Sequence, residues 1–136
     1  MIVLDEQLLG RGLEQDIAHW YRGTVQFITA LRPHTIIKDE AIPALLRQQS
    51  QPTFVTINER DFWRQVAPDQ RYCIVCFVLS DARAHDIPPA LRALLHRPEL
   101  RTKAQRMGKV MRVTHADMSY YTFRDRQVRT MPLTAQ

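Results

Sequence analysis

In this 136-residue chain, acidic residues lie directly after segments that are expected to be strands, or at the start of segments that are expected to be helices. The pair Asp5-Glu6 follows residues 1–4, the pair Asp39-Glu40 begins a helical pattern, and Asp61 closes the polar run after residues 53–57. In an open parallel α/β sheet, ligands bind beyond the carboxyl ends of the strands. Carboxylates gathered there repel one another unless a cation lies among them, and Mg²⁺ or Mn²⁺ prefers such hard oxygen ligands. The pattern therefore predicts a divalent-metal site.

The individual acids differ in how well an ordinary structural role explains them. Asp39 can cap a helix, Asp61 can be a first-turn acid that complements a helix dipole, and Asp81 is expected to cap the helix after residues 72–79. Asp5 ends a buried strand with no cap or ion pair evident nearby, so we expect it to be the principal metal ligand. Asn58 offers a weaker amide oxygen.

Hydrophobic periodicity predicts alternating strands and helices. Strands are expected over residues 1–4, 24–31, 53–57, 72–79 and 109–114, and helices over residues 8–21, 39–49, 59–66 and 87–95. This alternation is typical of a parallel, doubly wound sheet. Two further β segments, residues 119–123 and 128–131, predict a terminal hairpin or meander. We expect a single domain over residues 1–136, with a core over about residues 1–114 and C-terminal strands over about residues 115–132.

Charge is distributed unevenly along the chain, whose formal net charge is +5. Residues 1–81 contain 8 Lys or Arg against 10 Asp or Glu, whereas residues 82–136 contain 11 against 4. A basic segment beside an acidic metal site favours a polyanionic substrate such as a nucleic acid. The alternative is a solvated helix face. The residues expected to follow a phosphate backbone are Arg101, Lys103, Arg106, Lys109 and Arg112.

Cys73 and Cys76 form a C-x-x-C motif inside the apolar segment 72–79. Residues three apart on a strand point to opposite faces, so the two thiols are not expected to converge on a metal or a disulfide. We predict that both are core residues. No apolar run is long enough to span a bilayer, and Asp5 and Glu6 interrupt the first apolar run, so a cytoplasmic location without a membrane partner is expected.

Three short motifs in order resemble those of PIN-like proteins, in the small branch grouped with VapC-type toxins. Residues 2–7 resemble the opening "LLDEN", and residues 39–42 resemble a helix start of the form "D-E-x-I/L". Residues 56–62 are similar to a strand end of the form "T-x-D-x-D-F". The resemblance covers about residues 1–80, with a looser match through Arg112.

This resemblance implies a three-layer α/β/α fold with a mostly parallel central sheet and, here, a short C-terminal β extension. It implies a Mg²⁺- or Mn²⁺-dependent endoribonuclease, often the toxin of a toxin–antitoxin pair, with RNA, an antitoxin protein and a second copy of the chain as partners. Asp5, Asp39 and Asp61 match the family's catalytic and metal-binding positions. The supporting residues are Glu6, Glu40, Thr56 and Asn58.

The chain departs from the family pattern at Gln7, where the family has Asn, and at Asn58, where it has Asp. One extra residue also separates Asn58 from Asp61. An amide in place of a carboxylate lowers the negative charge of the site, so the alternative is a degenerate PIN-like module that binds RNA or a protein partner without cleavage. A receiver domain ranks below both, because Asn58 occupies the position where its phosphorylated Asp is expected.

Overall fold

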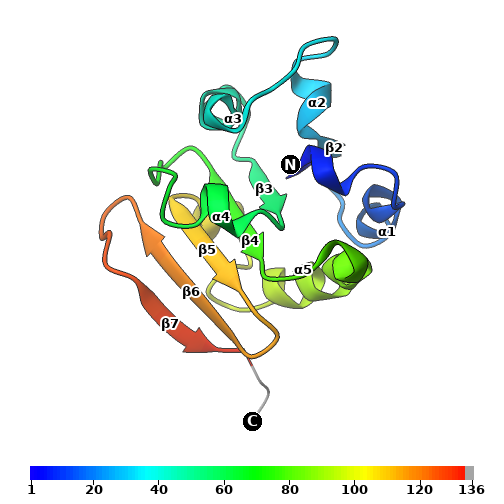
Figure 1. Cartoon of the computed structure of the whole chain (residues 1–136). Helices are drawn as coiled ribbons and strands as arrows, with labels where there is room; N and C mark the ends of the chain where they lie inside the picture. The colour runs from blue at the N-terminus through cyan, green and yellow to red at the C-terminus, as the bar shows by residue number, and fades with distance from the viewer. Residues whose placement is uncertain (134–136) are drawn as a thin grey trace.

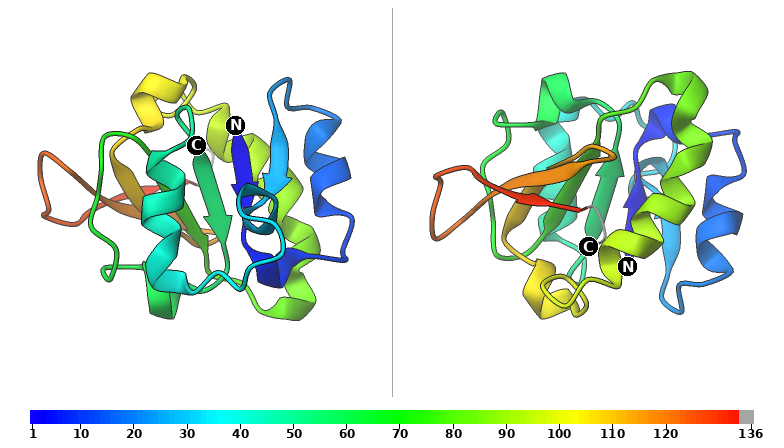
Figure 2. Two further views of the ribbon diagram at one scale, coloured as in Figure 1. Left: turned by 90° about the horizontal axis from the view of Figure 1, so that it is seen from above. Right: turned by 90° about the horizontal axis from the view of Figure 1, so that it is seen from below.

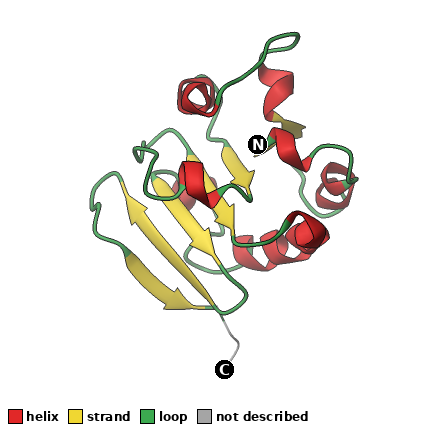
Figure 3. Ribbon diagram, viewed as in Figure 1, coloured by secondary structure: helices red, strands yellow, loops and turns green. Residues whose placement is uncertain are grey.

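A seven-stranded sheet with helices packed against it forms the protein (Figures 1 and 3), and the computed structural model describes residues 1–133. The strands are β1 (Ile2–Leu4), β2 (Val25–Phe27), β3 (Thr53–Thr56), β4 (Cys73–Phe77), β5 (Lys109–Val113), β6 (Asp117–Thr122) and β7 (Arg129–Pro132). The α-helices are α1 (Leu13–Ala18), α2 (Ile28–Leu31), α3 (Ile42–Arg47), α4 (Glu59–Phe62), α5 (Ile87–Leu95) and α6 (Lys103–Arg106). Single turns or short runs of 3₁₀ helix are η1 (Glu6–Leu8), η2 (Asp39–Ala41) and η3 (Asp81–Asp86).

The strand order is β2-β1-β3-β4-β5-β6-β7, and the pairs from β2 to β5 are parallel. The chain runs from β1 outward to β2 and then crosses back to β3 on the other side of β1. The strand order therefore reverses between β1 and β3, and their carboxyl ends form the switch point at which α/β sheets bind ligands. The last two strands pair antiparallel, so the expected mixed α/β fold with a mostly parallel sheet is confirmed.

Apolar side chains alternate between the two faces of the sheet, and helices cover both faces (Figure 2). Ile2 and Leu4 pack in one cluster with side chains of α1 and α5, whereas Val3, between them, packs in a second cluster with side chains of α2, α3 and α4. All three of β1, β3 and β4 are buried throughout, and β1 and β4 are continuous apolar runs, as strands covered on both faces are, whereas β3 has a buried Thr at each end.

Two predicted elements were wrong in extent or type. The helix expected over residues 8–21 begins only at Leu13, because Gly10 and Gly12 adopt positive φ angles of 78° and 73° that no helix accommodates. The strand expected over residues 24–31 is β2 followed at once by α2, whose Ile28 is buried. Even the longest helix, α5, has nine residues, and none of the helices within residues 1–133 has the length and apolar character of a membrane span.

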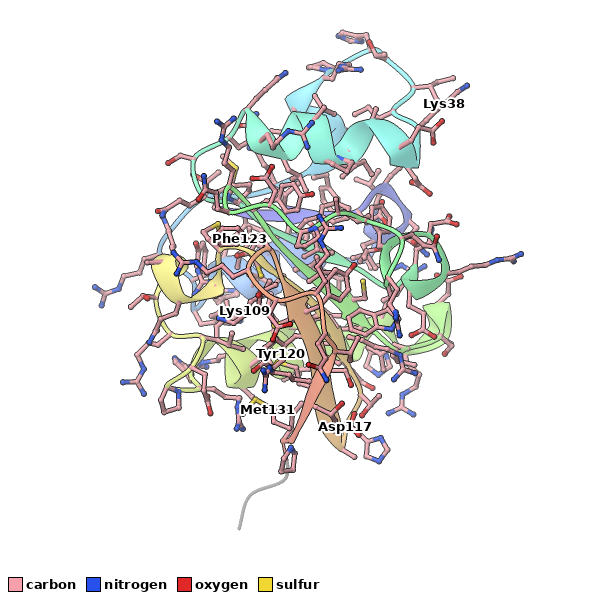
Figure 4. The ribbon with its side chains drawn as sticks, turned by 90° about the vertical axis from the view of Figure 1, so that its left-hand side faces the viewer. Lys38, Lys109, Asp117, Tyr120, Phe123 and Met131 are labelled. Atoms are coloured by element: carbon pink, nitrogen blue, oxygen red, sulfur yellow. The ribbon has the colours of Figure 1, made fainter. Side chains whose placement is uncertain are left out.

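The C-terminal strands form a meander on the edge of the sheet next to β5, as expected. Figure 4 views this side, with Lys109 at the start of β5 and Asp117 at the start of β6 at opposite ends of the strand pair. The amino and carboxyl ends of the parallel strands form two opposite edges of the sheet. The five residues of β5 span the distance between these two edges, about 13 Å at the usual rise per residue.

The C-x-x-C cysteines lie on opposite faces of β4, as predicted. Cys73 packs in the cluster under α1 and α5, and Cys76 packs in the other. Both are free and fully buried. Burial raises the pKa of Cys73 to about 12 and raises the pKa of Cys76 as well, because an apolar interior disfavours the thiolate.

Both thiols should therefore be unreactive toward a chromogenic disulfide reagent at pH 8 in the folded protein. Adding denaturant should release two thiols per chain, with the same midpoint as the loss of helical circular dichroism. Rapid labelling of either thiol without denaturant would contradict the burial of β4.

Candidate functional site

Asp5 lies immediately after β1, against the end of β3. The pairing places Leu4 beside Val55, and the Asp5 amide donates to the Val55 carbonyl at 3.0 Å. The next residue of β3, Thr56, donates its hydroxyl to Asp5 Oδ2 at 2.6 Å. Asp5 is only 5% exposed, and Thr56 is fully buried. The Asp5 carboxylate is therefore buried at the switch point, where it is held by the end of β3.

The expectation that Asp5 has no cap role was wrong. Asp5 is the N-cap of η1, and its Oδ1 accepts a hydrogen bond from the Glu6 amide at 2.8 Å. Burial raises the pKa of Asp5, and the hydrogen bonds from Thr56 and Glu6 partly oppose that rise. The carboxylate thus has a structural role, and both of its oxygens are engaged by donors that also hold it in place.

Asn58 connects Asp5 and Thr56 to the other two acids. Its amide nitrogen in the backbone donates to Thr56 Oγ1 at 2.9 Å, so the same hydroxyl that donates to Asp5 accepts from Asn58. Asn58 is the N-cap of α4, with its Oδ1 accepting from the Asp61 amide at 3.2 Å. Its side-chain Nδ2 donates to Asp61 Oδ2 at 2.8 Å and, more weakly, to Asp39 Oδ2 at 3.4 Å.

The three acids that the sequence predicts as ligands interact electrostatically. The pKa of Asp39 is raised to about 6 by burial and then by Asp61 and Asp5. The pKa of Asp61 is lowered, chiefly because Asn58 donates to its carboxylate. Because Asp61 raises the pKa of Asp39 and, to a smaller extent, that of Asp5, we treat Asp5, Asp39 and Asp61 as one unit, the acidic cluster.

The acidic cluster supplies the hard oxygen donors that Mg²⁺ and Mn²⁺ prefer. Within residues 1–133, no three Asp, Glu, His or Cys side chains converge closely enough to enclose a metal ion by themselves. Mg²⁺ usually takes only one or two carboxylates and completes its shell with water and substrate phosphate oxygens. The donor set fits that open kind of site.

A groove of about 450 Å³ is lined by Asp39, Glu40 and Asp61, whereas Asp5 is not among its lining residues. Arg47 and Tyr72 also line it, and neither is predicted from the sequence as a site residue. Arg47 follows Asp39 by eight residues, about two helical turns, so helical spacing was the available signal for placing both on one side. Glu6, predicted as a supporting residue, is exposed beside Asp5 and is absent from the groove lining.

The basic residues predicted to bind RNA do not gather at this site. Arg112, toward the carboxyl end of β5, pairs with Glu59 at 2.6 Å. The others precede or begin β5 and therefore lie at the opposite edge of the sheet; they are Arg101, Lys103, Arg106 and Lys109. One phosphodiester at the acidic cluster cannot contact both groups, since the two edges are about 13 Å apart.

Asp81 does not cap the helix after β4, contrary to expectation. Ser80 holds the N-cap position of η3, without a side-chain capping bond, and the Asp81 carboxylate instead pairs with Arg11 at 3.1 Å. Arg11 also donates to the Asp81 carbonyl at 2.6 Å. Asp81 therefore ties the loop after η1 to the loop after β4 and does not join the acidic cluster.

Comparisons with protein-family models, with curated proteins and with solved structures gave no match for this chain.

Asp39→Asn should stabilise the protein at high pH. A folded-state pKa of about 6, above the ordinary 3.8, means that the ionised carboxylate costs stability above pH 6 and that this cost disappears as the pH falls toward 4. Asn imitates the protonated form, so the variant should gain on the order of 1–2 kcal/mol at pH 8 and nothing near pH 4. Denaturant unfolding at several pH values measures the difference.

Asp16→Asn is the matched control, because it removes the same charge from an exposed residue of α1. Equal stabilisation by both variants at pH 8, or a gain from Asp39→Asn that does not change with pH, would show that Asp39 is not coupled to the other acids.

Proposed function

We propose that the protein is a divalent-metal-dependent endoribonuclease with a PIN-like fold, in which Asp5, Asp39 and Asp61 hold Mg²⁺ or Mn²⁺. The observation that carries the proposal is the acidic cluster at the reversal of strand order. Asp39 and Asp61 both accept hydrogen bonds from Asn58 there, Asp5 is linked to Asn58 through Thr56, and burial together with the neighbouring carboxylates raises the pKa of Asp39 to about 6. A cation is the simplest partner for such a group.

The positions of the three motifs support the same proposal. Residues 2–7, 39–42 and 56–62 each resemble a PIN-like motif, and the hydrogen bonds of Asn58 and Thr56 bring Asp5, Asp39 and Asp61 of these motifs together. Short motifs that matched by chance would not be expected to lie close together at one edge of the sheet. The resemblance also implies an antitoxin protein, a homodimer and a cytoplasmic toxin, and these belong to the proposal.

Each residue of the cluster has a distinct part in this account. Asp5 is the anchor, because Thr56 and the Glu6 amide fix its two oxygens. Asp39 and Asp61 are more exposed than Asp5 and line the groove, where they can reach a cation that is also bound to water and to phosphate. When bound, the metal ion would generate a nucleophilic water and stabilise the leaving oxygen of a phosphodiester.

The groove also offers RNA a second contact. Arg47 lines it, and a guanidinium there can contact a second backbone phosphate. The ring of Tyr72 forms part of the wall, while its hydroxyl donates to the Ala67 carbonyl. The acidic cluster would hold the scissile phosphate through the metal, and Arg47 would hold its neighbour.

One observation favours a second candidate, a PIN-like module that binds RNA or a protein partner without cutting. The Asn58 side chain donates to both Asp39 and Asp61, at the place where the family pattern has a carboxylate. An amide that already links two carboxylates partly takes the role of a cation. In that case the groove would remain a binding surface and the metal-dependent step would be lost.

Incubating RNA with the protein and Mn²⁺ tests the proposal. Asp5→Asn should lower the cleavage rate by about 100-fold or more, since it removes the anchor of the charge that stabilises the transition state. Asp16→Asn is the matched control, because Asp16 is an exposed acid on α1 and its loss changes the net charge equally. Circular dichroism checks that both variants are folded.

Cleavage by Asp5→Asn at the wild-type rate would contradict the proposed site. RNA that is retained but left intact by the wild-type protein, with Mn²⁺ present, would instead identify the non-cleaving module.

A further inference from the structure

A second cavity lies at the amino edge of the sheet, opposite the acidic cluster. It has a volume of about 440 Å³ and is lined by side chains from the end of α1, the end of α5 and the segment around α6. Four arginine or lysine residues line it together with His96, and no carboxylate does within residues 1–133. Uncompensated positive charge around a cavity of this kind favours an anionic ligand.

Arg106 is the clearest sign that an anion belongs there. It is 3% exposed, and its guanidinium donates to neutral acceptors: Nε to Thr53 Oγ1 at 3.2 Å, and Nη1 to the Leu100 and Arg101 carbonyls at 2.9 and 3.2 Å. Within residues 1–133, no carboxylate pairs with it and its Nη2 makes no hydrogen bond to the protein. A buried cation without a counter-charge is costly, and Arg106 lines the cavity.

The local structure around α6 fixes the charges that accompany Arg106. A capping box between Thr102 and Gln105 sets the start of this single helical turn. Lys103 and Arg106 are its first and last residues, and a separation of three places them on the same side of the turn. Lys103 is exposed and lines the cavity, so its ammonium can reach an anion that also contacts Arg106.

The cavity also has an aromatic wall. Trp20 and Tyr21 follow α1 with their ring centroids 6.2 Å apart and their planes at 79°, so the two rings present different faces. Both are partly exposed and line the cavity. Exposed aromatic faces stack on nucleobases, and a volume of about 440 Å³ is in the range of small-ligand sites.

We infer that this cavity, the amino-edge pocket, binds the phosphate of a nucleotide between Lys103 and Arg106, with the base against Trp20 or Tyr21. The ligand is a free nucleoside monophosphate or the 5′-phosphorylated end of an RNA strand, which share this chemistry. The inference does not depend on the proposed nuclease activity, because the pocket and the acidic cluster are on opposite edges of the sheet. It also gives a role to three of the basic residues that lie away from the acidic cluster.

Binding of adenosine 5′-monophosphate, measured by calorimetry in about 0.1 M salt, tests the inference. We expect a dissociation constant below about 1 mM, with adenosine and inorganic phosphate at least about tenfold weaker, because each lacks one half of the recognition. Trp20 fluorescence, recorded in a Trp63→Phe background, should change with the same saturation curve, since the chain has two tryptophans.

Lys103→Glu should weaken the nucleotide at least about tenfold. The matched control is Arg92→Glu, which makes the same change of charge at an exposed residue of α5 that lies outside the pocket lining. It should leave the affinity unchanged. Comparison of 5′-phosphorylated with 5′-hydroxyl RNA distinguishes the two sources: preference for the phosphorylated strand without mononucleotide binding assigns the pocket to RNA ends.

Three results would overturn the inference. One is the absence of saturable binding by both the mononucleotide and the phosphorylated strand. Another is an equal loss of affinity in Lys103→Glu and Arg92→Glu, which would indicate attraction by net charge alone. The third is binding of inorganic phosphate as tightly as the nucleotide, which would remove the aromatic wall from recognition.

Discussion

The parallel pairing of β1 with β3 is the constraint on which the site depends. It is a short pairing, with Ile2, Val3 and Leu4 opposite residues 53–55, yet it ends where the strand order reverses. One residue beyond it, Asp5 meets the hydroxyl of Thr56, and Thr56 in turn holds the backbone of Asn58. A shift of one residue in this pairing would turn Thr56 to the opposite face and separate the carboxylate from its donor. The acidic cluster is thus a consequence of strand register.

Asn58 decides how the acidic cluster behaves. Its side chain closes the first turn of α4 through Oδ1 and links Asp61 to Asp39 through Nδ2, so a helix cap and a charge bridge are made by one amide. A carboxylate at this position could cap α4 equally well, because capping needs only an oxygen acceptor. It could not donate to Asp39 or Asp61, and it would add negative charge. The amide therefore lowers the repulsion that a cation would otherwise relieve, which favours the non-cleaving module. It also links Asp39 and Asp61, and the proposed nuclease needs these two carboxylates close together.

Sequence reasoning recovered the features that depend on periodicity and strand order. The burial of Cys73 and Cys76 on opposite faces followed from the two-residue repeat of a strand, and the position of Asp5 after β1 and of Asn58 after β3 at the same end of the sheet followed from where these parallel strands end. It missed features set by tertiary contacts or backbone conformation. Pairing of Asp81 with Arg11, 70 residues away, has no local signal. The five basic residues look like one stripe in the sequence, but β5 begins at Lys109 and carries Arg112 toward the other edge of the sheet. The left-handed Gly10 and Gly12 delay the first helix in a segment whose apolar spacing suggested an earlier start.

Titration of Mn²⁺, followed by the loss of its free-ion electron paramagnetic resonance signal, tests the proposed metal site most directly. The comparison is between the wild-type protein, Asn58→Asp and Asp5→Asn. The account predicts one bound ion per wild-type chain, tighter binding by Asn58→Asp because a fourth carboxylate joins the cluster, and weaker binding by Asp5→Asn. Equal Mn²⁺ affinity in all three proteins would contradict the claim that these residues form a metal site.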